Sequence, residues 1–207
     1  MDPDIGEVLK AAQAQLAAQV PRLQADHVGA RHSLNRLVGA IANQALGSID
    51  SAAEHELRLL VDVAMLDFEI RTLVLRLLEA PEDRAVWEKY LVLAIWQALE
   101  EISPRIGPTL REAGREYAAA IKPVKADKEF AGEIADVRNR LVAHRSSEGP
   151  GAGHLEWATL ALGSQELGLP AAATHLAQRA PLIARALHDL GSAVIRKHAA
   201  LFPEAKV

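Results

Sequence analysis

The amino-acid sequence predicts an all-α fold, a helical bundle with long antiparallel helices. Only 4% of the residues are aromatic, and no run alternates apolar and polar residues between turn signals, as strands would require. Apolar residues recur instead at helical spacing. Half of the 207 residues are hydrophobic, which is enough for a full core. We expect a single domain over 1–207. The alternative is a boundary at 146–153, with 154–207 forming a C-terminal helical appendage.

The first half of the chain is expected to form three helices. One covers 5–19, with Pro21 interrupting or ending it, and the next covers 26–45. The capping-box spacing that begins at Ser51 predicts a third helix over 52–79. This helix is apolar nearly all round, which predicts a central position. Its acids either lie on a narrow polar face or pair with an arginine of another helix; they are Asp62, Asp67 and Glu69.

The clearest helical periodicity lies between Pro81 and Pro104. Its expected apolar stripe consists of Val86, Trp87, Tyr90, Leu91, Ala94, Ile95, Ala98, Leu99 and Ile102. The polar residues expected to face away are Glu88, Lys89, Gln97, Glu100 and Glu101.

The rest of the chain predicts further helices over 109–121, 125–143 and 181–201, with Pro123 closing the first of them. The stripe of the second is Phe130, Ile134, Val137 and Leu141. Between the last two, 146–153 reads Ser-Ser-Glu-Gly-Pro-Gly-Ala-Gly, which is typical of a loop or a linker.

Composition and charge exclude several classes of function. The formal charge of −4 gives no global basic field, so a nucleic-acid contact would depend on a local arginine cluster. Because there are no cysteines, disulfides, thiolate metal sites and cysteine nucleophiles are excluded. The acidic start of the chain does not resemble a signal peptide. The most apolar stretch, 59–78, carries five charged residues, so no membrane span is expected and the cytoplasm is the expected location.

Metal and cofactor sites find little support in the sequence. The chain has eight histidines but neither the Glu-x-x-His spacing of metal-binding bundles nor a His-Glu-x-x-His pattern. The glycines of 149–153 lack the preceding strand and the Gly-Lys-Ser/Thr ending of a phosphate loop. We therefore expect no cofactor and no metal, with scattered histidines at the surface or at helix ends. A metal site built by histidines from distant helices stays open as an alternative.

One segment places four phosphate-binding or proton-transfer groups within eight residues: Arg138, Arg140, His144 and Arg145. At about 100° per residue, Arg140 and His144 share a helix face, whereas Arg138 lies about 120° from His144. One interpretation is structural, with Asp136 and Arg140 in an exposed ion pair and the last cations next to the helix C-terminus. The other is a site that binds phosphate and transfers a proton.

The run Arg138-Asn139-Arg140-Leu141-Val142-Ala143-His144 resembles the signature of the HEPN superfamily, the higher eukaryotes and prokaryotes nucleotide-binding domains. That signature is an Arg, often followed by Asn, and a His after four to six further residues, late in a helix of an all-α bundle. The Ala-His-Arg ending at Arg145 is similar to that of abortive-infection-type members.

The resemblance implies a metal-independent endoribonuclease that acts as a homodimer, with two motifs facing across the interface. It assigns Arg138 to the scissile phosphate and His144 to proton transfer. It also implies that Asn139 orients backbone or substrate and that Arg140 and Arg145 bind flanking phosphates. The implied setting is a toxin–antitoxin or phage-defence system, with an antitoxin or regulatory protein as a partner.

Two alternatives remain beside this interpretation. In the first, the protein is a non-catalytic helical interaction or dimerisation protein, and the arginine and histidine of the motif hold the bundle together. In the second, it is a metal-bearing bundle. The catalytic interpretation predicts that His144 lies at or just beyond its helix end and is partly exposed, because the glycine-rich loop follows soon after.

Overall fold

The computed structural model describes residues 5–44, 51–79, 84–128, 130–132, 134, 135, 138 and 171–202. All regular secondary structure in these ranges is helical, which confirms the predicted all-α bundle. The α-helices are α1 (Ile5–Gln44), α2 (Ser51–Glu79), α3 (Arg84–Glu100), α4 (Arg111–Ala126) and α7 (Ala171–Lys197). Short 3-10 helices are η2 (Ser103–Arg105), η3 (Pro108–Leu110) and η5 (Ala199–Leu201).

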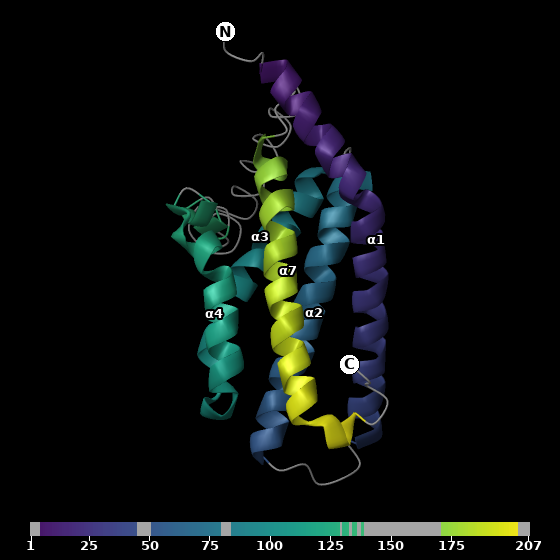
Figure 1. Ribbon diagram of the computed structural model, residues 1–207, viewed down its shortest axis with the longest axis vertical. Helices are drawn as coiled ribbons and strands as arrows, with labels where there is room; N and C mark the ends of the chain where they lie inside the picture. The colour runs from purple at the N-terminus through teal and green to yellow at the C-terminus, as the bar shows by residue number, and fades with distance from the viewer. Residues whose placement is uncertain are drawn as a thin grey trace, which may run out of the picture.

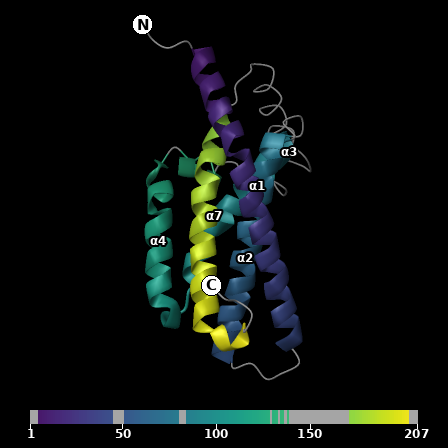
Figure 2. The same cartoon turned by 45° about the vertical axis from the view of Figure 1, so that its right-hand side comes forward.

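The long helices lie side by side and mostly antiparallel. Figures 1 and 2 show α7 between α2 and α4, with α1 along the other side of α2. Helix α3 packs against both α2 and α7. The N-terminal turns of α1 extend beyond the rest of the bundle (Figure 1). No helix within the described ranges has the length and apolar character needed to cross a membrane.

The core is centred on α2 and α7, as the apolar character of 52–79 predicts. Leu59 and Ile70 of α2 are fully buried, and so are Ile183, Leu187 and Val194 of α7. Because α7 contacts α1, α2, α3 and α4, it shares the core with the N-terminal half. The predicted loop at 146–153 lies outside the described residues.

Three helices continue through prolines that the sequence suggested as breaks: α1 at Pro21, α4 at Pro123 and α7 at Pro181. Helix α1 is continuous across Pro21, and α7 begins ten residues before Pro181 rather than at it. A proline inside a helix removes a backbone hydrogen bond and costs about 3 kcal/mol. Burial of Leu176 and Ile183 on either side of Pro181 offsets that cost. Pro21 lies on an exposed face, and Leu23 already packs in the core.

Helix α3 buries a different stripe at its N-terminal end from the one predicted. Val86 and Tyr90 are 48% and 49% exposed, whereas Glu88, expected to face away, is only 4% exposed. Further along, the helix follows the prediction, with Leu91, Ala94, Ile95, Ala98 and Leu99 buried. Position 88 precedes these buried positions at helical spacing, so Glu88 shares their face despite its charge.

Helix α4 is fastened to the end of α3 by two side chains. The Tyr117 hydroxyl donates a hydrogen bond of 2.6 Å to the Ala98 carbonyl, and Lys125 Nζ donates one of 3.0 Å to the Leu99 carbonyl. Carbonyls in the last turn of a helix lack partners within that helix. The two bonds therefore satisfy the C-terminal end of α3, and burial raises the pKa of Tyr117.

Asp127, not Pro123, separates α4 from the helical residues that follow. Helix α4 continues past Pro123 to Ala126, and Asp127 is extended, with φ −76° and ψ 96°. The Asp127 carboxylate then accepts a 3.1 Å hydrogen bond from the Phe130 backbone N–H, as a helix N-cap does. Arg179 of α7 pairs with the same carboxylate, and its guanidinium carbon lies 5.0 Å from the centre of the Phe130 ring. These contacts fix the start of the segment that carries the motif.

Two glycine substitutions should differ in their effect on stability. We expect Gly39→Ala in α1 to raise the free energy of unfolding by about 0.5–1 kcal/mol, because an added Cβ meets no atom within 4 Å. Gly114→Ala in α4 should raise the free energy of unfolding by less than this, or lower it, since the added Cβ would lie 2.9 Å from Ile106 Cγ2. Urea denaturation of both variants measures the difference. Equal stabilisation by both would contradict the close packing of α4 on Ile106.

Candidate functional site

Arg138 is the member of the motif that the structure describes, and it faces the bundle. It is helical and half-buried. Phe130 and Ile134, which precede it at intervals of four residues, are both buried in the core. The guanidinium carbon of Arg138 lies 4.5 Å from the centre of the Trp96 ring of α3. Such a cation–π contact contributes about 0.5–2 kcal/mol and gives the guanidinium a defined place beside α3.

The other predicted site residues lie outside the described part of the chain. They are Asn139, Arg140, His144 and Arg145. The structure therefore places Arg138 and does not describe its expected partners. The expected position of His144 near a helix end stays a prediction.

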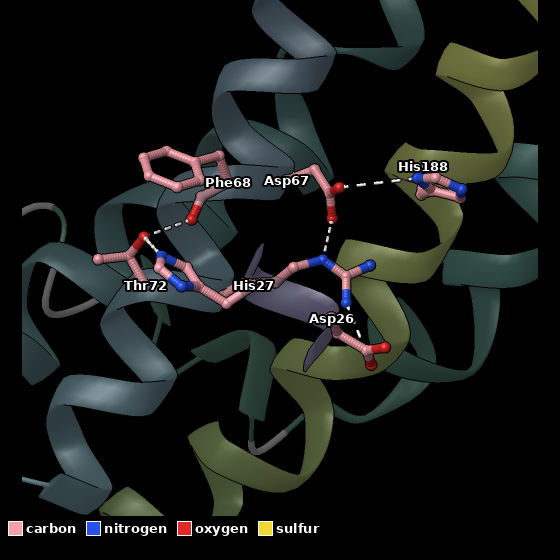
Figure 3. Close-up of polar contacts among 7 residues, drawn as sticks. Asp26, His27, Asp67, Phe68, Thr72 and His188 are labelled. Carbon is pink, nitrogen blue, oxygen red and sulfur yellow. Dashed lines mark hydrogen bonds and ion pairs between the residues drawn. The ribbon is translucent and has the colours of Figure 1, made fainter. Parts of the chain in front are cut away.

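A second polar cluster joins α1, α2 and α7, and Asp67 is the member that the sequence pointed out as a candidate buried acid. Asp67 of α2 is 5% exposed and accepts a 2.7 Å hydrogen bond from Nε of Arg71. The other oxygen of Asp67 lies 3.9 Å from Nδ1 of His188, and Nη1 of Arg71 lies 3.4 Å from the Asp26 carboxylate (Figure 3). Burial raises the pKa of Asp67 even though the charge of Arg71 lowers it. Arg71 thus offsets the negative charge of a carboxylate that is buried inside the bundle.

His27 of α1 lies next to this cluster. Its ring stacks on Phe68, with centroids 5.1 Å apart, and its Nε2 is 3.1 Å from the Thr72 hydroxyl (Figure 3). That hydroxyl donates to the Phe68 carbonyl, so the imidazole nitrogen is placed to donate to the hydroxyl oxygen. Burial lowers the pKa of His27, and the nearby charge of Arg31 lowers it further. The imidazole ring of His27 therefore serves to pack α1 against α2 through its contact with Phe68.

The side chains of this cluster border an open groove between α1, α2 and α7. Its volume is about 610 Å³, within the range of small-molecule sites. Charged side chains come from all three helices: Arg22 and Asp26, Asp67 and Arg71, Arg185 and His188. Apolar atoms of Leu23, Ala30 and Leu182 complete the walls.

A third cluster surrounds Glu56, near the start of α2. Its side chain is 4% exposed and accepts hydrogen bonds from Lys197 Nζ at 2.5 Å, from His198 Nε2 at 2.6 Å and from the Thr109 hydroxyl. Burial alone would raise the pKa of Glu56, but the three hydrogen bonds outweigh it and lower the pKa to about 2. The Glu56 cluster, which includes Thr109, Lys197 and His198, therefore ties η3 and the C-terminal end of α7 to α2.

The acids expected within α2 behave in three different ways. Asp62 pairs with Arg105 of η2, as one of the two interpretations foresaw. Asp67 is buried, and Arg71 of its own helix is its main partner. Glu69 lies on the exposed side. Glu56 was missed because its partners are separated from it by 53 to 142 positions in sequence, where no local spacing can indicate them.

Histidines of the described residues are spread over several elements. His55 bonds to the Arg105 carbonyl at 3.0 Å, His198 bonds to Glu56, and His188 lies near Asp67. Within the ranges that the structure describes, no group of three or more histidine or acidic side chains is arranged to hold a metal ion.

Arg71 is expected to contribute to the stability of the fold, because it is the charged partner of the buried Asp67. Arg71→Met should lower the free energy of unfolding by about 2 kcal/mol, because Asp67 keeps its burial and loses a charged hydrogen-bond donor. Asp67→Asn combined with Arg71→Met should recover part of that loss, since no buried charge is then left without compensation. Urea denaturation of the two single variants and the double variant tests this. Additive losses would show that the two side chains are not coupled.

Comparison with family models, with curated proteins and with solved structures gives no match for this chain. The candidate function therefore depends on the residues themselves.

Proposed function

We propose that the protein is an HEPN-like, metal-independent endoribonuclease that acts as a cytoplasmic homodimer in a toxin–antitoxin or phage-defence system. Its motif arginine would bind the scissile phosphate, and His144 would transfer the proton. The observation that carries this proposal is the motif itself, which begins at Arg138 on a helical segment whose start is fixed by Asp127 and Arg179.

The placement of Arg138 supports a phosphate-binding role. Its guanidinium lies beside the Trp96 ring and is half-buried, not extended into solvent. An arginine held in one place loses less conformational freedom when it binds a phosphate, and its planar fork matches two phosphate oxygens. Local cations of this kind are what an RNA site needs in a chain whose formal charge is −4.

The chemistry follows from the residue types. A histidine with an ordinary pKa near 6.5 can remove the proton of a ribose 2′-hydroxyl at neutral pH. The 2′-oxygen attacks the adjacent phosphorus, and the 5′-oxygen of the next nucleotide leaves and takes a proton. The arginine stabilises the extra negative charge on the five-coordinate phosphorus. The products are a 2′,3′-cyclic phosphate and a 5′-hydroxyl, and no metal-bound water takes part.

Dimerisation is a part of the proposal that the surface of α3 supports. The exposed side chains of Val86 and Tyr90 lie on the helix that carries Trp96. Apolar side chains of this size at a surface are typical of protein contacts when they are grouped. A second copy that covers them would place α3, which Arg138 contacts through Trp96, next to the interface.

A second candidate function is a non-catalytic interaction module, and the cation–π contact of Arg138 is the observation that favours it. In that case Arg138 serves to hold its helix against α3, and the motif has no substrate.

The experiment that separates the two functions is an RNA cleavage assay in the presence of a chelator, with the mass of the protein measured in the same buffer by light scattering. We expect a dimer that cleaves single-stranded RNA and leaves single-stranded DNA intact, because DNA lacks the 2′-hydroxyl. A folded dimer that cleaves no RNA would favour the interaction module.

A further inference from the structure

The groove between α1, α2 and α7 contains more positive charge than its own acids compensate. Of its two aspartates, Asp67 is engaged by Arg71 at 2.7 Å, and Asp26 lies 3.4 Å from the same guanidinium. Arg71 thus serves both acids. Two further arginines of the groove, Arg22 and Arg185, remain.

These two arginines have no strong partner among the described residues. Arg22 is exposed and takes part in no ion pair or hydrogen bond within the described ranges. Arg185 approaches Asp189 only at 3.9 Å, and both side chains are largely exposed, at 76% and 66%. An exposed pair at that distance is largely screened by water and contributes little. Arg22 belongs to α1 and Arg185 to α7, so the two charges come from opposite walls of one groove.

We propose that the groove binds a small phosphate monoester, with its phosphate between Arg22 and Arg185 and its organic part against the apolar wall.

The two arginines without a strong partner among the described residues, Arg22 and Arg185, favour a ligand that carries two negative charges. A phosphate monoester carries close to two negative charges at neutral pH and three outer oxygens, so it can accept hydrogen bonds from two guanidinium forks at once. A carboxylate has one charge and two oxygens, which match one fork. The apolar atoms of Leu23, Ala30 and Leu182 offer a surface to a ring or sugar carbon skeleton.

The Asp67–Arg71 pair lies at the base of the groove and is already formed without a ligand. The side chain of Arg71 is only 13% exposed and is held by a buried carboxylate. Its guanidinium offsets the negative charges of Asp67 and Asp26, so these acids repel an anion bound by the two exposed arginines less strongly. His188 also lines the groove, and its Nδ1 is 3.9 Å from Asp67. The site is on the side of α7 that faces α1 and α2, whereas Arg138 contacts α3.

Calorimetric titration at low ionic strength tests the proposal with two monoesters, phenyl phosphate and uridine 5′-monophosphate. Phenol and uridine are the matched controls without phosphate. We expect at least one monoester to bind and neither control to bind. Arg22→Gln and Arg185→Gln should each weaken the binding about tenfold, which is the usual effect of losing one charged hydrogen-bond donor.

A further variant makes the result specific to the groove. Arg115→Gln removes an exposed arginine of α4 outside the groove and should leave the Kd unchanged. The titration measures binding and no RNA cleavage, so a failure of the proposed nuclease function does not affect this test. Thermal unfolding of each variant establishes that it is folded; both groove arginines are exposed, so folding should be preserved.

Three results would overturn the proposal: no binding of either monoester, binding that survives both groove substitutions, or equal binding of uridine and its monophosphate. A 5′-phosphorylated oligoribonucleotide that binds through the two arginines while neither monoester does would also overturn it, in favour of an RNA-binding groove.

Discussion

Replacing His144 with alanine is expected to lower the rate of RNA cleavage about 10²- to 10⁴-fold, the usual contribution of a positioned general acid or base. No other side chain in the motif titrates near neutral pH, because its remaining ionisable groups are arginines. The initial rate of cleavage of a labelled oligoribonucleotide measures the effect. His32→Ala, at an exposed position of α1, is the matched control and should leave the rate unchanged. Cleavage that survives His144→Ala would exclude this histidine from the chemistry.

Substitutions of Arg138 separate a catalytic role from a structural one. Arg138→Ala should lower the cleavage rate about 10²- to 10³-fold, as the loss of a charge-stabilising donor does. Arg138→Lys keeps a cation near the Trp96 ring but loses the planar fork. The lysine variant should therefore retain the stability of the protein and not its activity. If lysine restores activity as well as stability, Arg138 acts mainly through its contact with Trp96.

Replacing Glu56 with glutamine is expected to lower the free energy of unfolding by about 3 kcal/mol. The pKa of Glu56 falls from its ordinary value of 4.5 to about 2, and each pKa unit corresponds to about 1.4 kcal/mol. An amide cannot replace a carboxylate that accepts bonds from Lys197 and His198 together. Glu54→Gln is the control, because Glu54 and Arg58 form an exposed i,i+4 pair, and it should change stability by less than about 0.5 kcal/mol.

The same carboxylate predicts how stability depends on pH. Because the pKa of Glu56 is lower in the folded than in the unfolded protein, its contribution is fully present above pH 4.5 and is lost as the pH falls towards 2. The difference in unfolding free energy between the wild type and Glu56→Gln should therefore be constant near neutral pH and shrink below 4.5. Urea denaturation at several pH values measures it. A difference that stays constant down to pH 2 would show that the ionised carboxylate is not what stabilises the Glu56 cluster.

The sequence was sufficient for the class of fold and for the central helix. An apolar run over 52–79 without glycine or proline leaves little alternative to a buried helix, and α2 covers Ser51–Glu79. Local rules were less reliable at Pro21 and Pro181, because the burial of neighbouring residues outweighed the cost of a proline inside a helix. Glu88 shows the same limit: its charge predicts exposure, whereas its position on the helix places it inside.

The polar clusters depend on contacts between distant parts of the chain. Glu56 meets Lys197 and His198 only because α7 lies along α2, and that pairing has no signature in either helix alone. The groove arises in the same way, from Arg22 and Arg185 on helices far apart in sequence. The motif at Arg138 could be predicted because its residues are close in sequence and share one helical segment.

The proposed function is tested most directly by a pair of oligoribonucleotides that differ by a single oxygen. The first is cleaved by the purified protein in the presence of a chelator, and the site of cleavage is mapped. The second has the same sequence with a 2′-deoxyribose on the 5′ side of that bond. We predict that the first yields a 2′,3′-cyclic phosphate and that the second is not cut at this position. Cleavage of both at the same bond would contradict attack by the 2′-hydroxyl and, with it, the proposed mechanism.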